Sequence, residues 1–148
     1  MIRRASRILL LVTLLPSWSH ADAAADAALA VMDRFLAAFN ARDVGAWADT
    51  LLYPHVRFAG GKVTTYPDRD AFIAAGKRLE ALEAGEGWDH STWDAREIVQ
   101  ESDTKVHIAT VFSRYRADGT RYATYQSLYI VEAVDGKWGI RARSSFAP

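Results

Sequence analysis

The chain has 148 residues, 50% of them hydrophobic and 24% charged, which is the balance of one globular domain with an apolar core. It contains no cysteine, and this excludes disulfides, a thiolate nucleophile and Cys-based zinc or iron–sulfur sites. Basic and acidic residues number 18 each, so no excess of positive charge points to a nucleic-acid partner.

The N-terminal segment has the pattern of a secretory signal peptide. Arg3, Arg4 and Arg7 precede an apolar run from Ile8 to Leu15 that is too short to span a bilayer. The segment Ser19-His20-Ala21 then places small residues at the −3 and −1 positions of a cleavage site. We therefore predict a cleaved leader at 1–21, a single mature domain at 22–148, and a periplasmic or secreted location.

Cleavage also changes the charge of the chain. It removes three arginines and no acid, so 15 of the 18 basic residues remain against 18 acidic ones. A mildly acidic domain disfavours nucleic acid and anionic membranes. With no cysteine to carry a lipid, we expect no stable membrane insertion after cleavage.

The next segments have the signals of helices. Ala23 to Asn40 repeats apolar residues at three- and four-residue spacing, which predicts an amphipathic helix. Asp43 is suited to cap a second helix from Val44 to Leu52, and Tyr53-Pro54 should stop it. A third helix is expected from Arg69 to Ala84, before two glycines.

The remaining segments read as strands. His55 to Phe58 and Lys62 to Tyr66 form a predicted hairpin around Gly60-Gly61. Four longer strands joined by tight turns follow, at Thr92–Gln100, Lys105–Arg116, Arg121–Ala133 and Lys137–Phe146. Helices first and an antiparallel meander afterwards indicate an α+β fold.

The long strands carry apolar residues on both faces. Val106 and Ile108 lie on one face of the predicted strand, and Ala109 and Val111 lie on the other. Helices cover one face of a single sheet, so the second apolar face needs another cover. We therefore expect a homodimer that forms through the outer face.

Two motifs resemble a known superfamily. They are Phe35-Leu36-Ala37-Ala38-Phe39-Asn40-Ala41-Arg42-Asp43-Val44, with Trp47 and Leu51-Leu52-Tyr53-Pro54 after it, and the closing Asp135-Gly136-Lys137-Trp138-Gly139-Ile140. The order of elements and these motifs are similar to the nuclear transport factor 2-like superfamily, in its SnoaL-like and ketosteroid-isomerase-like branch. The resemblance implies a cone-shaped, curved antiparallel sheet wrapped around three helices from the N-terminal half. It also implies an apolar cavity between the sheet and the first helix.

The resemblance also tests one reaction. Its isomerases need an oxyanion-stabilising hydroxyl and a carboxylate base. The matching positions here are Phe35 and either Gly60 or Gly61, none of which supplies the required group. Steroid isomerisation by the usual arrangement is therefore not expected.

His55 and Arg57 are the candidate catalytic residues. They lie two apart on a predicted strand, so they share one face. In one interpretation the pair lies at a pocket and binds an anionic or carbonyl group, with His55 as acid–base. In the other, Val56 and Phe58 face the core and the pair points to water, and the alternation favours this second orientation.

Aromatic residues are the main evidence for a pocket. The predicted lining consists of Phe35, Phe39, Trp47, Tyr53, Phe58, Trp88, His90, Tyr115 and Tyr129. His90 follows Asp89 between two tryptophans, and it forms either a ligand-binding lip or a simple loop cap. The scattered histidines lack the spacing of a metal site, and no cofactor is expected.

Three functions remain open from the sequence. The first is an exported protein that binds a small apolar or amphipathic ligand. The second is a cofactor-free lyase, isomerase or hydrolase that uses His55 and Arg57. The third is a non-catalytic module for dimerisation or partner binding.

Overall fold

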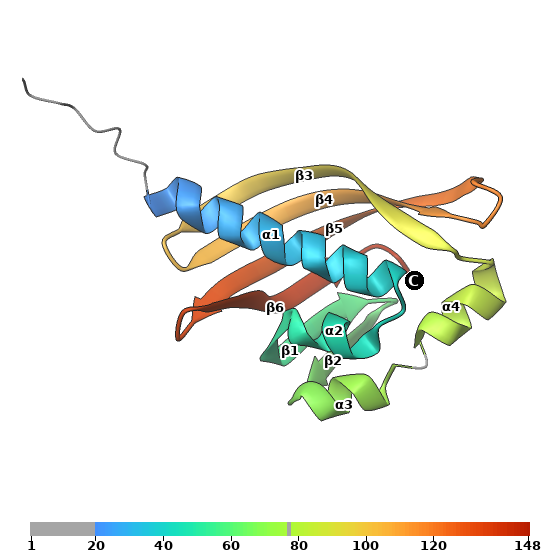
Figure 1. Cartoon of the computed structure of the whole chain (residues 1–148), viewed down its shortest axis with the longest axis horizontal. Coiled ribbons are helices and arrows are strands. Elements are labelled where there is room, and N and C mark those ends of the chain that lie inside the picture. The colour runs from blue at the N-terminus through green and yellow to red at the C-terminus, as the bar shows by residue number, and fades with distance from the viewer. Residues whose placement is uncertain (1–19, 77) are drawn as a thin grey trace, which may run out of the picture.

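A computed structural model describes residues 20–76 and 78–148 of the chain, and the predicted leader therefore lies almost wholly outside the described residues. The described residues form four helices and one six-stranded sheet (Figure 1). The elements are α1 His20–Asn40, α2 Val44–Asp49, β1 Leu51–Ala59, β2 Lys62–Tyr66, α3 Arg69–Ala74, α4 Arg78–Glu86, β3 His90–Ser102, β4 Lys105–Tyr115, β5 Arg121–Val134 and β6 Lys137–Ser145. No helix in this part of the chain is both long enough and apolar enough to cross a membrane.

The sheet has the strand order β2-β1-β6-β5-β4-β3. Four of its neighbouring pairs are antiparallel, as predicted, but β1 runs parallel to β6, so the sheet is mixed. The last strand thereby joins the β1–β2 hairpin to the long meander. This pairing places Arg57 of β1 directly beside Arg143 of β6.

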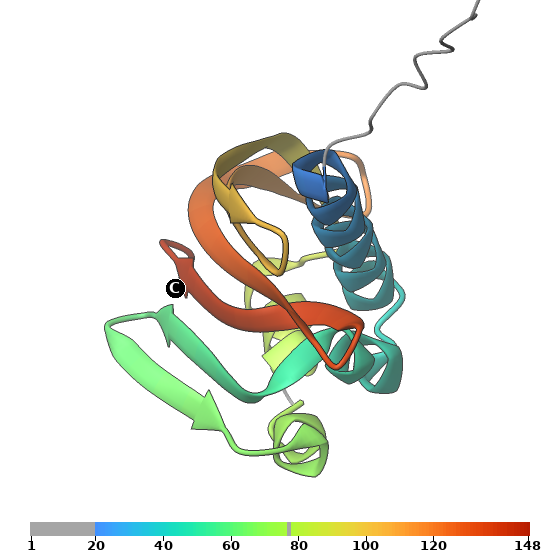
Figure 2. The same cartoon turned by 90° about the vertical axis from the view of Figure 1, so that its left-hand side faces the viewer.

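The sheet curls around α1, and the core lies between them. Figure 2 shows the strands curving around the helix, while α2, α3 and α4 close the open side. Val31, Met32 and Phe35 of α1 are buried against Ile108 of β4 and Tyr129 of β5. The predicted α+β cone is confirmed.

Two predicted helices differ from the observed ones. The second helix ends at Asp49, because Leu51 already pairs with Ile140 of β6 as a strand residue. The predicted helix 69–84 is divided into α3 and α4 near Gly76. A Cβ atom there would lie 2.8 Å from the Ile73 carbonyl oxygen and 3.0 Å from a Val44 methyl group, so the close approach requires glycine.

Asn40 and Asp43, at the end of α1 and just after it, fix neighbouring segments through side-chain hydrogen bonds. The Asn40 side-chain amide donates to the Ser91 carbonyl at 2.9 Å and accepts from the Ser91 amide at 2.9 Å, which fixes the start of β3. Asp43 caps α2 by accepting from the Ala46 amide at 2.9 Å, as predicted. The Asn-x-x-Asp motif is thus structural.

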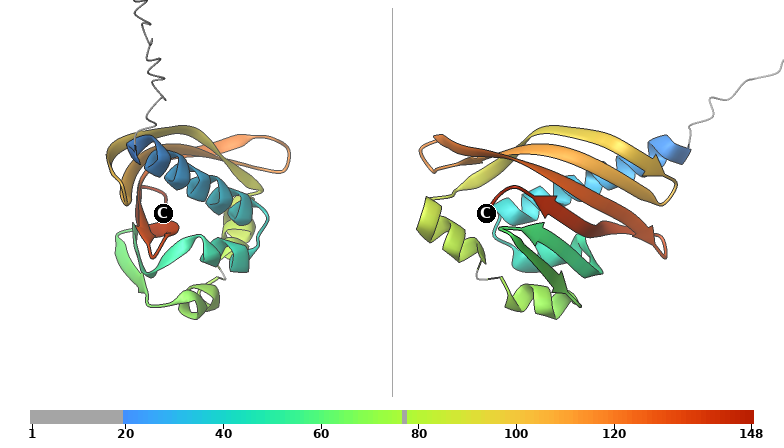
Figure 3. Two further views of the ribbon diagram at one scale, coloured as in Figure 1. Left: turned by 60° about the vertical axis from the view of Figure 1, so that its left-hand side comes forward. Right: turned by 180° about the vertical axis from the view of Figure 1, so that it is seen from behind.

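The outer face of the sheet carries no helix in the described structure, as the right-hand view of Figure 3 shows. Phe58, Leu128 and Phe146 are exposed there, with Phe146 at 79%. This is the second apolar face expected from the sequence.

Candidate functional site

A small cavity lies between the inner face of the sheet and helices α1, α2 and α4. Its volume is about 70 Å³, roughly five times the space that one ordered water needs. Its lining residues come from every layer of the fold: Phe35, Leu36, Phe39, Trp47, Arg57, Leu79, Leu82, Ser91, Trp93, Phe112, Arg114, Tyr129, Arg143 and Pro148. Apolar side chains therefore enclose a few strongly polar groups.

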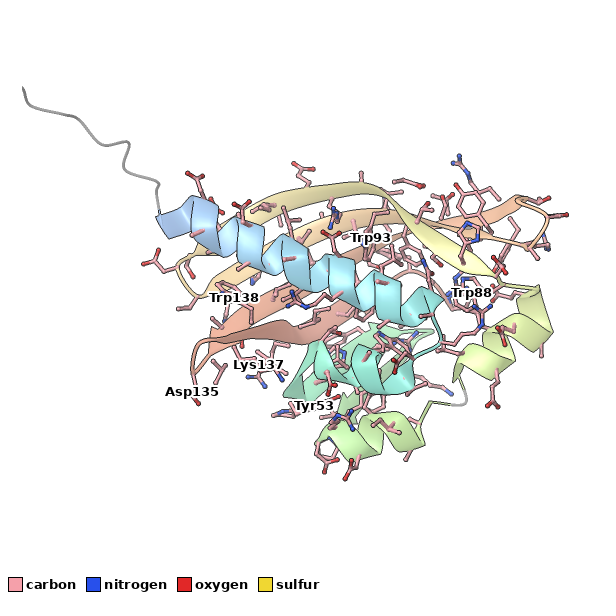
Figure 4. All side chains as sticks on the ribbon, viewed as in Figure 1. Tyr53, Trp88, Trp93, Asp135, Lys137 and Trp138 are labelled. Atoms are coloured by element: carbon pink, nitrogen blue, oxygen red, sulfur yellow. The ribbon has the colours of Figure 1, made fainter. Side chains whose placement is uncertain are left out.

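Six of the fourteen lining residues are aromatic. Phe35 contacts Trp47 and Tyr129 edge-on, at centroid distances of 5.7 and 5.6 Å. Trp93 packs edge-on against Tyr129 at 5.7 Å, and Phe39 against Trp47 at 5.1 Å. Figure 4 shows Trp93 between the sheet and α1. Such interlocked rings hold the cavity walls in fixed positions.

Arginines of the inner face form the polar part of the wall. Arg57 of β1 is 9% exposed, and its Cα partner across the parallel pair is Arg143 of β6. The Arg143 guanidinium lies over the Tyr129 ring, 5.7 Å from its centroid. Burial raises the pKa of the Tyr129 hydroxyl, while the charges of Arg143 and Arg57 oppose that rise.

A third arginine reaches the cavity from β4. Arg114 is buried and pairs with Glu86 at the end of α4, with 2.9 Å between Nη1 and Oε2. The Tyr122 hydroxyl donates to the same carboxylate oxygen at 3.0 Å. Burial, together with this contact to Glu86, raises the pKa of Tyr122 to about 12. These contacts tie α4 to the sheet at one end of the cavity.

His55 lies on the inner face but does not line the cavity. It is 4% exposed, and Tyr66 and Phe72 cover its ring at centroid distances of 6.2 and 6.4 Å. Its Nδ1 lies 3.0 Å from the Ile140 carbonyl oxygen, so Nδ1 carries the proton and donates. Burial lowers the pKa of His55 to about 4, and the charge of Arg143 adds to that effect.

The predicted orientation of this strand is wrong. His55 and Arg57 are buried, whereas Phe58 is 46% exposed on the outer face. Strand alternation predicted that the pair shares a face, and it does. It could not identify the inner face, because Val56 and Phe58 belong to an outer surface that is itself apolar.

The predicted pocket residues divide into two groups. Phe35, Phe39, Trp47 and Tyr129 line the cavity, as does the candidate Arg57. Tyr53, Phe58, Trp88, His90 and Tyr115 do not. The Tyr53 hydroxyl donates to the Ala48 carbonyl at 3.0 Å, and Trp88 Nε1 donates to the Ser91 hydroxyl at 3.0 Å, so both hold local structure.

His90 forms a separate surface contact. Its Nδ1 lies 2.8 Å from Asp89 Oδ2. Its ring stacks on Tyr115 at a centroid distance of 4.9 Å. In Figure 4 Trp88, near α4, lies at the opposite end of the molecule from Asp135, Lys137 and Trp138 of the closing hairpin. The predicted aromatic residues thus lie in several parts of the molecule and do not all line one pocket.

Sequence reasoning missed Arg114, Arg143 and Phe112 as members of one cavity wall. The sequence contains a partial signal for two of them. Arg114 has the same strand parity as the buried Ile108 and Phe112, which places it on the inner face. A bulge in β6 hides the corresponding signal for Arg143.

The NTF2-like protein (DUF6841) family profile matches residues 25–146, nearly the whole described chain. The chain belongs to this NTF2-like family. Solved structures agree on the fold. An NTF2-like protein from Shewanella oneidensis matches with a TM-score of 0.67 and 18% identity, over 82% of this chain and 98% of that one. No curated protein is significantly similar in sequence.

Two further structures extend this comparison of NTF2-like folds. An NTF2-like protein with a cystatin-like fold from Novosphingobium aromaticivorans has a TM-score of 0.68 and 14% identity, over 84% of this chain and 82% of that one. A Catenulispora acidiphila structure in complex with S-DNPA has a TM-score of 0.64 and 16% identity, over 84% and 93% of the two chains. At these identities the likeness concerns the fold.

The residues that match the catalytic positions of the isomerases have structural roles in this NTF2-like chain. Phe35 lines the cavity with an unsubstituted ring. Gly60 and Gly61 form the β1–β2 turn with φ angles of 60° and 69°, a conformation that favours glycine. Neither place supplies an acid or a base.

Proposed function

We propose that this NTF2-like protein binds a small amphipathic molecule in the cavity under α1. The observation that carries the proposal is the cavity itself, an aromatic enclosure with a few buried polar groups. This combination is typical of small-molecule sites. The relative from Catenulispora acidiphila, solved in complex with S-DNPA, supports the use of this fold for ligands.

The cavity can be blocked from α1. Leu36 lines it, whereas Leu29 of the same helix packs against the core elsewhere. Leu36→Phe should narrow the cavity, and Leu29→Phe is the matched control. Ligand-detected NMR with a panel of small aromatic and aliphatic compounds should show binding to the wild type and the control, and loss in Leu36→Phe. Equal binding by all three proteins, or binding by none, would contradict the proposal.

A cofactor-free reaction at His55 and Arg57 is the alternative. Acid–base chemistry requires the group to reach the substrate. Tyr66 and Phe72 cover the His55 ring, and its Nδ1 proton is bonded to Ile140. This arrangement favours binding over catalysis by His55. His55→Gln should leave the affinity for the compounds found above unchanged, and any turnover lost in this variant would favour the enzyme.

We also propose that two copies associate through the outer face. Phe58 and Leu128 are exposed beside a shallow groove, and Phe146 protrudes at the edge of a second one. In a two-fold contact each Phe146 can enter the partner's groove. Light scattering should report a dimer for the wild type and for Val134→Lys at the far end of β5, but a monomer for Leu128→Lys. A monomeric wild type at micromolar concentration would contradict this.

Export is a proposal as well. The basic and apolar leader pattern supports it, and the family match starts beyond the predicted cleavage point. N-terminal sequencing of the protein from its native cell should begin at Asp22. A chain that retains its first residues in the cytosol would contradict export.

A further inference from the structure

Three arginines from three strands converge on the same small cavity. Arg57, Arg114 and Arg143 all belong to its lining. Arg57 and Arg114 are 9% and 6% exposed, so these charges are largely removed from water. Buried guanidinium groups are unfavourable unless an anion compensates them.

Arg114 and Arg143 differ in their ion pairs. Glu86 pairs with Arg114 at one end of the cavity. Among the described residues no carboxylate forms an ion pair with Arg143, and its guanidinium lies over the ring of Tyr129. The Arg143 guanidinium on β6 therefore places a positive charge without a carboxylate partner, among the described residues, beside an aromatic wall.

The unsatisfied hydrogen-bonding groups of the cavity wall are all donors. Within the described part of the chain, four buried nitrogens of the lining have no hydrogen-bond acceptor: Nε of Arg114, Nε of Arg143, Nε1 of Trp47 and Nε1 of Trp93. Arginine and tryptophan side chains donate but never accept. A molecule that satisfies such a wall must bring acceptors rather than donors.

A carboxylate meets both requirements. It carries a negative charge and two oxygens with about four acceptor positions, and its planar shape matches a guanidinium in a two-point contact. The cavity volume of about 70 Å³ limits the remainder of the molecule to a compact group. The rings of Phe35 and Trp47 require that this group be apolar.

We propose that the ligand of this cavity is a small carboxylic acid with a compact apolar body, whose carboxylate is bound by Arg143. The apolar body packs against the aromatic wall. This inference rests on the proposed function, because it names the class of molecule that the cavity binds.

Matched pairs of acid and amide test the charge directly. The probes are butyrate with butyramide and benzoate with benzamide, titrated by calorimetry into the purified protein. Each pair has nearly the same shape, but the amide lacks the charge and adds donors. At least one acid should bind more tightly than its amide by about tenfold or more, as expected of a charge-assisted contact.

Variants then assign the preference to the site. Arg143→Met should reduce the acid to the affinity of its amide, and Arg143→Lys should retain part of the preference, because lysine keeps the charge but not the planar fork. Arg121→Met, at an exposed position on β5, is the matched control and should behave as the wild type. Circular dichroism checks that each variant is folded.

The outcomes separate this inference from the proposed function. Equal affinity for acid and amide, or a preference that survives in Arg143→Met, overturns the carboxylate and leaves small-molecule binding intact. The same holds if neutral compounds bind while all four probes fail, or if inorganic phosphate binds more tightly than either acid. If no compound binds in either experiment, both proposals fail.

Discussion

Two arginines of β6 show how differently one strand can use the same side chain. Arg141 donates from Nε to Glu132 at 3.1 Å and from Nη1 to the Tyr53 carbonyl at 2.6 Å. Arg143, two residues later, turns inward, lies over Tyr129 and has a buried Nε without an acceptor among the described residues. A structural arginine comes with its acceptors in the fold. The unused Nε of Arg143 is therefore the donor that we propose for the ligand.

The largest expected effect is a loss of folding stability at acidic pH, and it arises on the Arg143 side of β6, where His55 lies. His55, near Arg143, has its pKa lowered by burial to about 4. The unfolded chain binds that proton near its ordinary pKa of about 6.5, so stability is present above this pH and is lost as the pH falls toward 4. The free energy of unfolding should drop by up to about 3 kcal/mol across this window.

Denaturant titrations of the wild type and His55→Gln at several pH values measure this effect. The difference between the two proteins isolates His55 from the carboxylates that titrate in the same range. Parallel pH profiles would mean that His55 is not held neutral in the fold.

Removal of Arg141 and removal of Arg143 should change the free energy of unfolding in opposite directions. Arg141→Met deprives Glu132 and the Tyr53 carbonyl of a donor, and should destabilise the protein by about 1–2 kcal/mol. Arg143→Met removes a half-buried charge that has no carboxylate partner among the described residues, so we expect no loss and a gain of up to about 1 kcal/mol. Urea unfolding of both variants without ligand makes the comparison, and equal destabilisation would remove the distinction.

A smaller effect on stability is expected from the ion pairs that Glu132 forms with Lys105 and Arg141. Hydrogen bonds from Lys105, and then from Arg141, lower the pKa of Glu132. Its contribution is present above its ordinary pKa and is lost as the pH falls through the lowered value. Because Glu132 is partly exposed to solvent, we expect less than about 1 kcal/mol. Glu132→Gln should flatten the most acidic part of the unfolding profile, and an unchanged profile there would assign the acid response elsewhere.

Much of the fold could be predicted because its signals are local. The periodicity of α1 and the tight turns of the meander identified most elements. The start of β1 was missed because Leu51 and Leu52 fit the face of a helix as well as a strand. The break at Gly76 depends on a contact with Val44, which a local pattern does not contain.

The candidate site was less predictable for a related reason. Alternation placed His55 and Arg57 on one face, but both faces of this sheet are apolar, so the pattern does not identify the inner one. Arg57 and Arg143 meet because β1 and β6 pair in parallel, and these strands are about as far apart in the sequence as the fold allows. Long-range pairing, not residue type, creates the arginine site.

The most direct test of the central claim is the free energy of unfolding of the wild type and Arg143→Met, each with and without saturating butyrate or benzoate. A ligand that binds the folded state raises its stability. We predict that one of these acids stabilises the wild type but not Arg143→Met, and that without acid the variant is at least as stable as the wild type. Equal stabilisation of both proteins, or of neither, would contradict the claim that Arg143 is kept for a carboxylate ligand.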